Sequence, residues 1–309
     1  MPLDSHPQRV AAGVTKEAEP LAYVNLYCTS QCNSRCVTCD FWQRPVQTLE
    51  PAAVESVVNS RFVDGSTWLA LQGGEFVLHP QADELLEMAS TRQYILFTNL
   101  LAPARVEALV KRHQVPFVSV SLDGGPQGYA KIRGVDAFAK VTQGILRLRQ
   151  FAEVSVGITL TPWSSLHDYY QASHFCREYG IDFGVNLYTN SRIYGANGPL
   201  CAPGLVAEVA RDCGDAFCSA YASWVSGKLQ LPCQSIRRVV SIGPDGTVHL
   251  CHNRQERLGN LRDSTFDSIW TSHKTLELHT RYTTCNDCWT SCYREYDLAD
   301  ARIPVDQPD

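Results

Sequence analysis

The residues that most directly indicate chemistry are closely spaced cysteines near the N-terminal end of the chain. The segment CTSQCNSRCVTCDFW contains Cys32, Cys36 and Cys39 in a C-x3-C-x2-C spacing. Three thiolates at this spacing can hold three irons of a cubic iron–sulfur cluster and leave the fourth iron open to a substrate. Cys28 lies outside the pattern, because a register beginning there would need a cysteine where Arg35 stands. We expect Cys28 to be a buried residue at a strand end.

A second group of cysteines lies in the C-terminal third of the chain. Cys233 and Cys251 are separated by a predicted hairpin, and Cys285 and Cys288 form a C-x2-C pair. Ligands from such distant segments can converge on one metal centre, either an iron–sulfur cluster or a structural zinc ion. Cys292 is a fifth thiol that could replace one of the four ligands or stay free. The cysteines without ligand spacing are expected to be ordinary thiols: Cys176, Cys201, Cys213 and Cys218.

Composition excludes several classes of function. The 309 residues include 27 Lys and Arg against 32 Asp and Glu, with a net charge of -5 and no dense basic tract, so we expect no nucleic-acid partner. No run approaches about 18 apolar residues and no apolar signal core begins the chain, which predicts a cytoplasmic protein without a membrane partner. In a reducing compartment, the thirteen cysteines indicate metal sites or catalysis rather than disulfides.

Short apolar runs rich in β-branched and aromatic residues alternate with helical patterns over the first two thirds of the chain. The predicted strands are 22–27, 68–71, 94–98, 117–121, 154–160 and 183–188. The predicted helices are 50–60, 81–91, 103–113, 136–151 and 165–179. This alternation predicts an α/β fold with a parallel sheet, closed or partly closed as a barrel.

The pattern changes near residue 190, where a Gly-, Pro- and Asn-rich connector begins. The expected elements beyond it are a helical region over 206–230, two strands over 237–242 and 247–251, and a helical segment over 265–279. The expected organisation is a flexible segment over 1–20, a barrel over 21–200 and a smaller domain over 201–309.

Polar motifs follow the ends of the predicted strands, where barrel enzymes keep their ligand contacts. The second strand ends in Gly73-Gly74-Glu75. Glycines let a backbone approach a ligand closely, and a carboxylate beside them can pair with a cationic amine. The following strand ends supply further polar residues: Thr98, Asn99, Ser121 and Asp123. Taken alone, the first motif could be an ordinary turn, and Asp123 could be a turn or cap residue.

Together, the cysteine spacing and these motifs resemble the radical S-adenosylmethionine (SAM) superfamily. The resemblance implies a partial (β/α)6 TIM-like barrel whose [4Fe-4S] cluster binds SAM. The residues that it implies for SAM contacts are Gly73, Gly74 and Glu75 at the methionyl amino end, and Thr98, Asn99, Ser121 and Asp123 around the rest of SAM. The chain departs from the family at Thr38, where an aromatic residue near the adenine is usual, and Val156 to Thr159 on the fifth strand are further candidates for adenine contact.

The C-terminal region resembles the twitch form of the SPASM/twitch domain, which holds one auxiliary [4Fe-4S] cluster. By this resemblance the auxiliary ligands are Cys233, Cys251, Cys285 and Cys288. The whole pattern is similar to radical SAM dehydrogenases of aminocyclitol antibiotic pathways, which oxidise an alcohol of a substrate such as 2-deoxy-scyllo-inosamine. It implies a radical SAM oxidoreductase that abstracts hydrogen from a small aminocyclitol- or aminoglycoside-like molecule, forms a ketone and passes an electron to the auxiliary cluster.

The implied partners are a small-molecule substrate and an external one-electron reductant such as flavodoxin or ferredoxin. Polar residues near the sixth strand end are candidate substrate contacts: Asn186, Tyr188, Asn190 and Arg192. A radical SAM epimerase is an alternative, with Cys292 as the hydrogen donor. A peptide-modifying maturase is a second alternative, which the roughly 20 residues before the barrel disfavour. A non-catalytic iron–sulfur or zinc protein is the alternative from another class, and it predicts no SAM cleavage.

Overall fold

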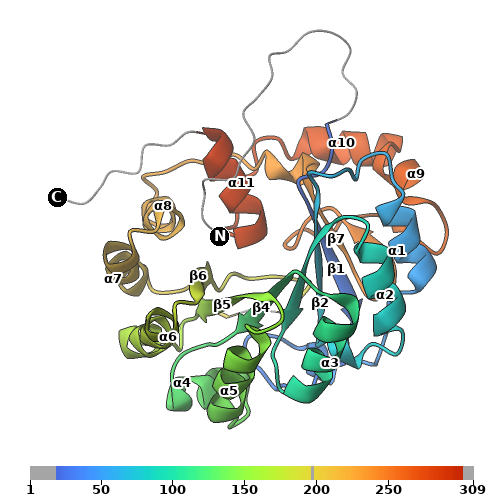
Figure 1. Ribbon diagram of the computed structural model, residues 1–309. Helices are drawn as coiled ribbons and strands as arrows, with labels where there is room; N and C mark the ends of the chain where they lie inside the picture. Colours follow the sequence, from blue (N-terminus) through green and yellow to red (C-terminus); the bar gives the residue numbers. More distant parts are fainter. Residues whose placement is uncertain (1–18, 196–197, 302–309) are drawn as a thin grey trace.

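The computed structural model describes residues 19–195 and 198–301 (Figure 1). Nearly all of the predicted flexible segment 1–20 therefore lies outside the described residues. The strands are β1 (Tyr23–Thr29), β2 (Trp68–Gly73), β3 (Gln93–Thr98), β4 (Phe117–Ser121), β5 (Glu153–Leu160), β6 (Asp182–Leu187), β7 (Val239–Ile242), β8 (Thr247–His249) and β9 (Arg257–Asn260). No helix in these ranges is long and apolar enough to cross a membrane.

All nine of these strands form one sheet, in the order β6-β5-β4-β3-β2-β1-β7-β8-β9. The pairs from β6 to β7 are parallel, whereas β8 and β9 add antiparallel pairs. Since β6 and β9 are its two edges, the curved sheet does not close on itself within the described residues. The predicted α/β fold with a partly closed, TIM-like barrel is confirmed.

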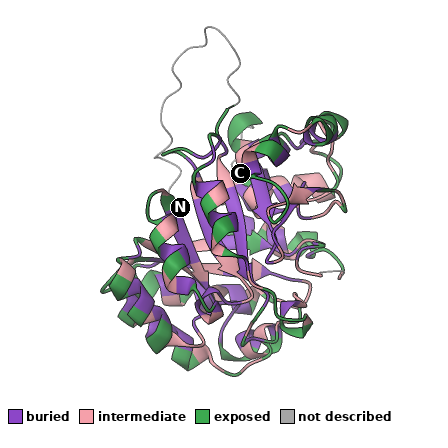
Figure 2. Ribbon diagram, turned by 90° about the vertical axis from the view of Figure 1, so that its right-hand side faces the viewer, coloured by how far each residue is buried: buried purple, intermediate pink, exposed green. Residues whose placement is uncertain are grey.

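Helices cover the outer side of this sheet (Figure 1). The bounds are α1 (Pro51–Val58), α2 (Ala82–Ala89), α3 (Pro103–His113), α4 (Pro126–Arg133), α5 (Phe138–Leu148), α6 (Leu166–Tyr179), α7 (Pro203–Cys213), α8 (Ala216–Val225), α9 (Phe266–Trp270), α10 (His273–Arg281) and α11 (Ser291–Ala301). Within the described residues the short 3-10 helices are η2 (Phe41–Gln43), η3 (Phe76–Leu78) and η4 (Ser235–Arg237). Figure 2 shows the sheet buried at the centre and the outer faces of the helices exposed.

Buried and partly buried residues alternate along the strands, which gives the sheet a packed outer face and a less buried inner face. In β5 the side chains of Val154, Val156, Ile158 and Leu160 are buried, whereas the residues between them are only partly buried. This period of two is that of an extended strand, whose successive side chains point to opposite sides. The apolar set packs in the main core with the helices, so small side chains such as Ser155 line the inner side of the barrel.

The region beyond residue 200 differs from the prediction in four ways. The helical segment predicted over 265–279 is two helices, α9 and α10. The predicted helix over 206–230 is two helices, because Gly214 ends α7 at φ +65° and the Asp215 carboxylate caps α8 by accepting from the Phe217 amide at 2.7 Å. The predicted hairpin is formed by β7 and β8, but a third strand, β9, extends it. Finally, β7 pairs with β1, so these residues continue the barrel sheet. The boundary near residue 200 stays a prediction.

Candidate active site

The first cysteine group lies on the loop that follows β1, and backbone hydrogen bonds hold that loop from two sides. Ser30 N donates to Gln47 O at 2.9 Å, which closes the loop on itself. Val37 N donates to Ile132 O at 3.0 Å, and Arg35 N donates to Arg133 O at the same distance. The last carbonyls of α4, which lack partners within their own helix, thus fix the cysteine loop.

Polar groups lie beside each sulfur of this loop, and backbone N–H donors point at those of Cys32 and Cys39. Ser34 N lies 3.4 Å from Cys32 Sγ, the Ser34 hydroxyl lies 3.3 Å from Cys36 Sγ, and Phe41 N lies 3.5 Å from Cys39 Sγ. Such donors stabilise thiolates bound to iron. Burial raises the pKa of Cys32 to about 11 and that of Cys39 to about 12, so iron must displace the thiol protons on binding. The donor set fits a cluster.

A single metal ion does not fit the cysteines equally well. Among the residues that the structure describes, no three His, Cys, Asp or Glu side chains are arranged to hold one metal ion. Four thiolates around one zinc ion would lie about 3.8 Å apart, as its bond length of about 2.3 Å and tetrahedral geometry require. A cluster places several irons between its thiolates and so tolerates wider spacing than a single zinc ion does.

The two glycines at the end of β2 allow the cysteine loop to lie directly against that strand. Gly73 has φ +141°, and a Cβ there would lie 2.4 Å from Thr29 O. A Cβ on Gly74 would lie 2.4 Å from Gln31 O, whereas Gly74 N donates to Thr29 O at 2.7 Å. Any side chain would push the loop away. The structure therefore gives both predicted SAM-binding glycines a packing role; direct contact with SAM stays a prediction.

The Glu75 carboxylate is buried at the end of the second strand. Its Oε1 accepts from the Thr98 hydroxyl at 2.8 Å, and its Oε2 accepts from Asn99 N at 2.7 Å. Burial raises the pKa of Glu75, and these hydrogen bonds oppose that effect. The Asn99 amide in turn donates to Asn33 at 2.8 Å and lies 3.7 Å from Cys32 Sγ. These predicted SAM-binding residues thus form one network with the cysteine loop.

The Asp123 carboxylate contacts both α4 and the fifth strand. One carboxylate oxygen accepts from Thr159 N at 2.7 Å, and the other pairs with Arg133 at 3.1 Å. Arg133 Nε is buried without a partner among the described atoms, which leaves a donor available to an anionic ligand beside the cysteine loop. Ser121 ends the adjacent β4 and is partly buried. Contact between Asp123 or Ser121 and SAM stays a prediction.

The three principal candidate substrate residues do not lie together. Asn186 faces the inner side of the barrel, since its Nδ2 would lie 3.4 Å from a Cβ placed on Gly157. The buried Tyr188 accepts from Gly198 N at 2.9 Å, whereas Arg192 Nε donates to Asn253 O at 3.1 Å. Of the three, Asn186 is placed for contact with a ligand inside the barrel; the roles of Tyr188 and Arg192 stay predictions.

The second cysteine group lies beside β7 and β8. Cys233 N donates to Cys285 O at 2.8 Å, so the first ligand segment is tied to the C-x2-C loop. Arg254 bridges Cys251 and Cys285, because its backbone N lies 3.4 Å from Cys251 Sγ and its Nη2 lies 3.3 Å from Cys285 Sγ. Burial and the neighbouring Cys288 and Cys285 raise the pKa of Cys251 to about 11. The predicted auxiliary ligands are therefore neighbours in space.

A buried arginine beside this group also fits a negatively charged cluster. Arg294 is fully buried and donates to Cys288 O at 2.8 Å, to Leu231 O and to Asp297 at 3.0 Å. Its Nη2 has no partner among the described atoms, and its charge lowers the pKa of the adjacent Cys233 against the stronger effect of burial. Thiolates with iron would give this unpaired donor a partner of opposite charge.

Cys292 contacts a residue of β1 and is also close enough to Cys288 for that thiol to help raise its pKa. It lies at the start of α11, and Asn25 Nδ2 donates to its sulfur at 3.7 Å. Asn25 is on the inner face of β1 and accepts from Gln72 Nε2 at 2.6 Å. The Cys292 thiol therefore faces the barrel interior. The Asn25 side chain lies between it and β2, the strand that carries Gly73. Burial raises the pKa of Cys292, which keeps the S–H bond intact near neutral pH.

Sequence reasoning missed a buried group that lies between the two cysteine loops. Tyr27 on β1 bonds to the Tyr194 hydroxyl at 2.9 Å and to His252 Nε2 at 3.0 Å, and its ring lies 5.9 Å from that of Phe41. Phe41 follows Cys39 by two residues, and His252 directly follows Cys251. The sequence contained one signal for this group, because His252 directly follows the predicted ligand Cys251.

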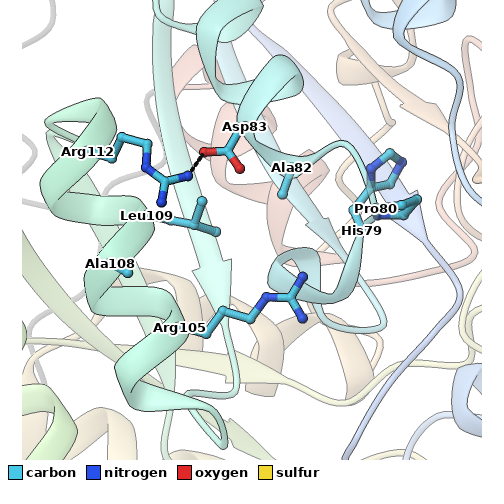
Figure 3. Close-up of a pocket in the computed structure, with 8 residues that line it drawn as sticks. All are labelled: His79, Pro80, Ala82, Asp83, Arg105, Ala108, Leu109 and Arg112. Atoms are coloured by element: carbon cyan, nitrogen blue, oxygen red, sulfur yellow. Dashed lines mark hydrogen bonds and ion pairs between the residues drawn. The ribbon is translucent and has the colours of Figure 1, made fainter.

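The surface pocket in Figure 3 lies elsewhere, between α2 and α3 on the outer side of the sheet. Its volume is about 150 Å³, and it contains the ion pair of Arg112 with Asp83 at 2.5 Å. None of its lining residues belongs to either cysteine group or to the motifs at the strand ends. It has no part in the candidate active site.

Comparisons with known proteins agree with this geometry. Residues 26–176 match the radical SAM superfamily, and residues 233–289 match SPASM, an iron–sulfur cluster-binding domain. The chain contains a radical SAM domain and a SPASM domain. Its cofactors are therefore SAM, a [4Fe-4S] cluster and an auxiliary iron–sulfur cluster. No curated protein shows a significant sequence match.

Solved structures with bound S-adenosylmethionine share the fold. Native anSMEcpe with bound AdoMet is 18% identical, with a TM-score of 0.59 over 84% of this chain and 83% of that one. The same protein with a Cp18Cys peptide is 19% identical, with a TM-score of 0.61 over 84% and 82%. SuiB of Streptococcus suis bound to S-adenosylmethionine is 15% identical, with a TM-score of 0.65 over 85% and 68%. At these identities the likeness concerns the fold alone.

Proposed function

We propose that this radical SAM enzyme oxidises an alcohol carbon of a small polar substrate to a ketone, and that the substrate is of the aminocyclitol or aminoglycoside class. When bound, the cofactors supply a 5′-deoxyadenosyl radical for hydrogen abstraction and an auxiliary cluster as electron acceptor. The protein has to hold SAM, the substrate and both clusters around one space and keep water from it.

The observation that carries this proposal is the meeting of the two ligand loops at Tyr27. The ring of Phe41, two residues after Cys39, and the imidazole of His252, next to Cys251, both contact the side chain of Tyr27. This contact supports a position of the auxiliary ligands near the SAM-binding loop, as electron transfer from a substrate to an auxiliary cluster requires. Continuity of the sheet through the β1–β7 pair holds this relation fixed.

The inner wall opposite Tyr27 supports a polar substrate. Ser119 on β4, Ser155 on β5 and Asn186 on β6 are all at least partly exposed on that wall. Their hydroxyl and amide groups can bond a polyhydroxylated or amino-substituted ring, because each offers both a donor and an acceptor. Contact between the Asn186 side chain and the substrate is part of this proposal.

The test is the mass of products formed from a panel of aminocyclitols and aminoglycosides in D2O. The anaerobically reconstituted full chain is incubated with SAM and dithionite, and the Cys32/Cys36/Cys39→Ala variant is the control. A product two mass units lighter, with 5′-deoxyadenosine formed only by the intact enzyme, supports oxidation. Formation of 5′-deoxyadenosine without any product two mass units lighter than its substrate would contradict the proposed oxidation.

Epimerisation is a second candidate, favoured by the position of Cys292. Its protonated thiol lies 3.7 Å from Asn25 on the inner face of β1, where it could return a hydrogen atom to a substrate radical. This reaction leaves the redox state of the substrate unchanged and adds one mass unit in D2O, because a thiol hydrogen exchanges with solvent. Cys292→Ala should then abolish the heavier product while 5′-deoxyadenosine still forms.

A further inference from the structure

Four cysteines in the middle of the chain belong to neither ligand group, and the fold brings two of them together. Cys213 is the last residue of α7, and Cys218 lies in the first turn of α8. Between them, Gly214 ends α7 at φ +65°, and the Asp215 carboxylate accepts from Cys218 N at 3.2 Å. The two cysteine side chains form a hydrogen bond with each other across this turn. We call Cys213 and Cys218 the thiol pair.

The two members of the thiol pair differ in their access to solvent. All thirteen cysteines are free thiols; Cys213 is the exposed one among them, whereas Cys218 is 0% exposed. The hydrogen bond with Cys218 lowers the pKa of Cys213, and the same bond, together with burial, raises the pKa of Cys218. An accessible sulfur with thiolate character is the one that attacks an oxidant, and a neighbouring thiol can then complete a disulfide.

Neighbouring elements hold both sulfurs at this turn. The buried Tyr169 of α6 donates its hydroxyl to Asp212 at 2.8 Å and also hydrogen-bonds Cys213, which fixes the end of α7. The Asp215 cap fixes the first turn of α8. A disulfide requires two side chains that point at each other across a short distance, and two thiols already joined by a hydrogen bond meet that requirement.

The helix that begins at this turn supports the auxiliary ligands. The rings of Phe217 and Trp224 on α8 lie 5.7 and 5.5 Å from that of Trp289, which directly follows Cys288. The Trp224 indole N–H also donates to Asn286 O at 3.2 Å, within the C-x2-C loop. Opening of α8 would therefore remove the packing on one side of that loop.

We propose that the thiol pair is a redox site that reacts with low-molecular-weight disulfides to form a reversible disulfide, and that this bond holds α8 against the C-x2-C loop. The Cys213 thiolate attacks one sulfur of the small disulfide and releases a small thiolate. Cys218 then displaces the second small thiolate from Cys213, and the Cys218 proton goes to it. Two protein thiols are thereby oxidised, and one small disulfide is reduced to two thiols. This proposal does not depend on the reaction that the radical SAM site catalyses.

The first test is mass spectrometry of the anaerobically reconstituted full chain after incubation with oxidised glutathione. Iron protects the ligand thiols, and the absence of oxygen preserves the clusters. Wild-type protein should lose two hydrogen atoms and about two alkylatable thiols per chain. Peptide mapping should place the new bond between Cys213 and Cys218, and dithiothreitol should restore both thiols.

Three variants assign the two steps. Cys213→Ser should slow the loss of thiols at least about tenfold, because it removes the attacking sulfur. Cys218→Ala should accumulate a mixed disulfide with one glutathione on Cys213, because the second step is blocked. Cys176→Ser is the matched control: burial raises the pKa of Cys176 to about 12, so its loss should leave disulfide formation unchanged.

The second test measures iron release from the oxidised and the reduced holoenzyme to a ferrous chelator. A cross-link between α7 and α8 limits local opening of α8, so the oxidised wild type should release iron about twofold more slowly. Cys213→Ser treated in the same way should release iron at the rate of the reduced enzyme.

Three results would overturn the proposal. Wild-type protein that keeps a glutathione on Cys213 would show that Cys218 does not reach it. Equal thiol loss in the wild type and Cys213→Ser would place the reaction at other cysteines. Equal iron release from the oxidised and reduced wild type would show that the bond does not support the C-x2-C loop.

Discussion

The Tyr27 hydroxyl lies 3.0 Å from His252 Nε2, and the same imidazole nitrogen lies 2.9 Å from the Ser241 hydroxyl. Tyr27 belongs to the first strand of the barrel, whereas Ser241 lies on β7 and His252 directly follows Cys251. A chain of buried hydrogen bonds therefore joins the SAM-binding half of the site to the auxiliary half, in addition to the pairing of β1 with β7.

Tyr27→Phe tests the strength of this link, because it keeps the ring and removes only the hydroxyl. Tyr194 and His252 each lose a buried partner, so the free energy of unfolding should fall by about 1–2 kcal/mol. Thermal unfolding followed by circular dichroism measures this change. Tyr94→Phe is the control, since no hydrogen bond of that hydroxyl is found among the described residues, and it should have little effect. Equal melting temperatures for wild type and Tyr27→Phe would contradict the link.

Arg294→Met removes the buried cation beside the auxiliary ligands. Asp297, whose side chain is 1% exposed, would keep its charge without a counter-ion, and breaking such a pair costs about 3–5 kcal/mol. The loop of Cys288 also loses its bond to the guanidinium. We expect a lower melting temperature and the loss of about four irons per chain, the content of one [4Fe-4S] cluster.

The control for this change is Arg281→Met on α10. Arg281 pairs with Glu277 at 2.6 Å, but both side chains are more than half exposed, and such pairs contribute about 0–1 kcal/mol. Iron content and melting temperature should stay near the wild-type values. If Arg294→Met retained all its iron and stability, the guanidinium would have no role in holding the C-x2-C loop.

The barrel could be predicted from sequence because its signals are local. Apolar runs bounded by turn residues located the six strands β1 to β6 to within a few residues, and Gly73-Gly74-Glu75 and Asn99 lie against the cysteine loop as their places at strand ends implied. Alternation along a strand and the meeting of parallel strand ends at one edge follow from backbone geometry alone.

The missed features depend on contacts between distant segments. Tyr27 meets Tyr194 across 167 positions and His252 across 225, and no local pattern reports such a meeting. The helix α4 was not predicted, and it offers the carbonyls of Ile132 and Arg133 to the cysteine loop. The predicted sites of SAM contact remain to be tested.

Iron counting separates the two predicted ligand sets. Cys32/Cys36/Cys39→Ala should retain about four irons per chain on the auxiliary site, and so should a variant without the four auxiliary ligands, which keeps the SAM-binding site. Cys292→Ser should retain about eight irons, because this thiol contacts Asn25 rather than completing a ligand set. Inductively coupled plasma spectrometry on anaerobic protein gives the counts. A loss of four irons in Cys292→Ser would make Cys292 a ligand.

His279 predicts how stability depends on pH. It lies on α10 against Trp270, with ring centroids 4.9 Å apart, and burial lowers its pKa to about 4 from the usual 6.5. Between these two values the unfolded chain binds more protons than the folded one, so the stability contributed by the neutral imidazole is complete above about pH 6.5 and is lost as the pH falls toward 4. His279→Gln removes the titrating group, and its melting temperature should fall less than that of the wild type between pH 7 and pH 5.5. Parallel melting curves for His279→Gln and the wild type over this range would show that His279 is not held neutral by its burial.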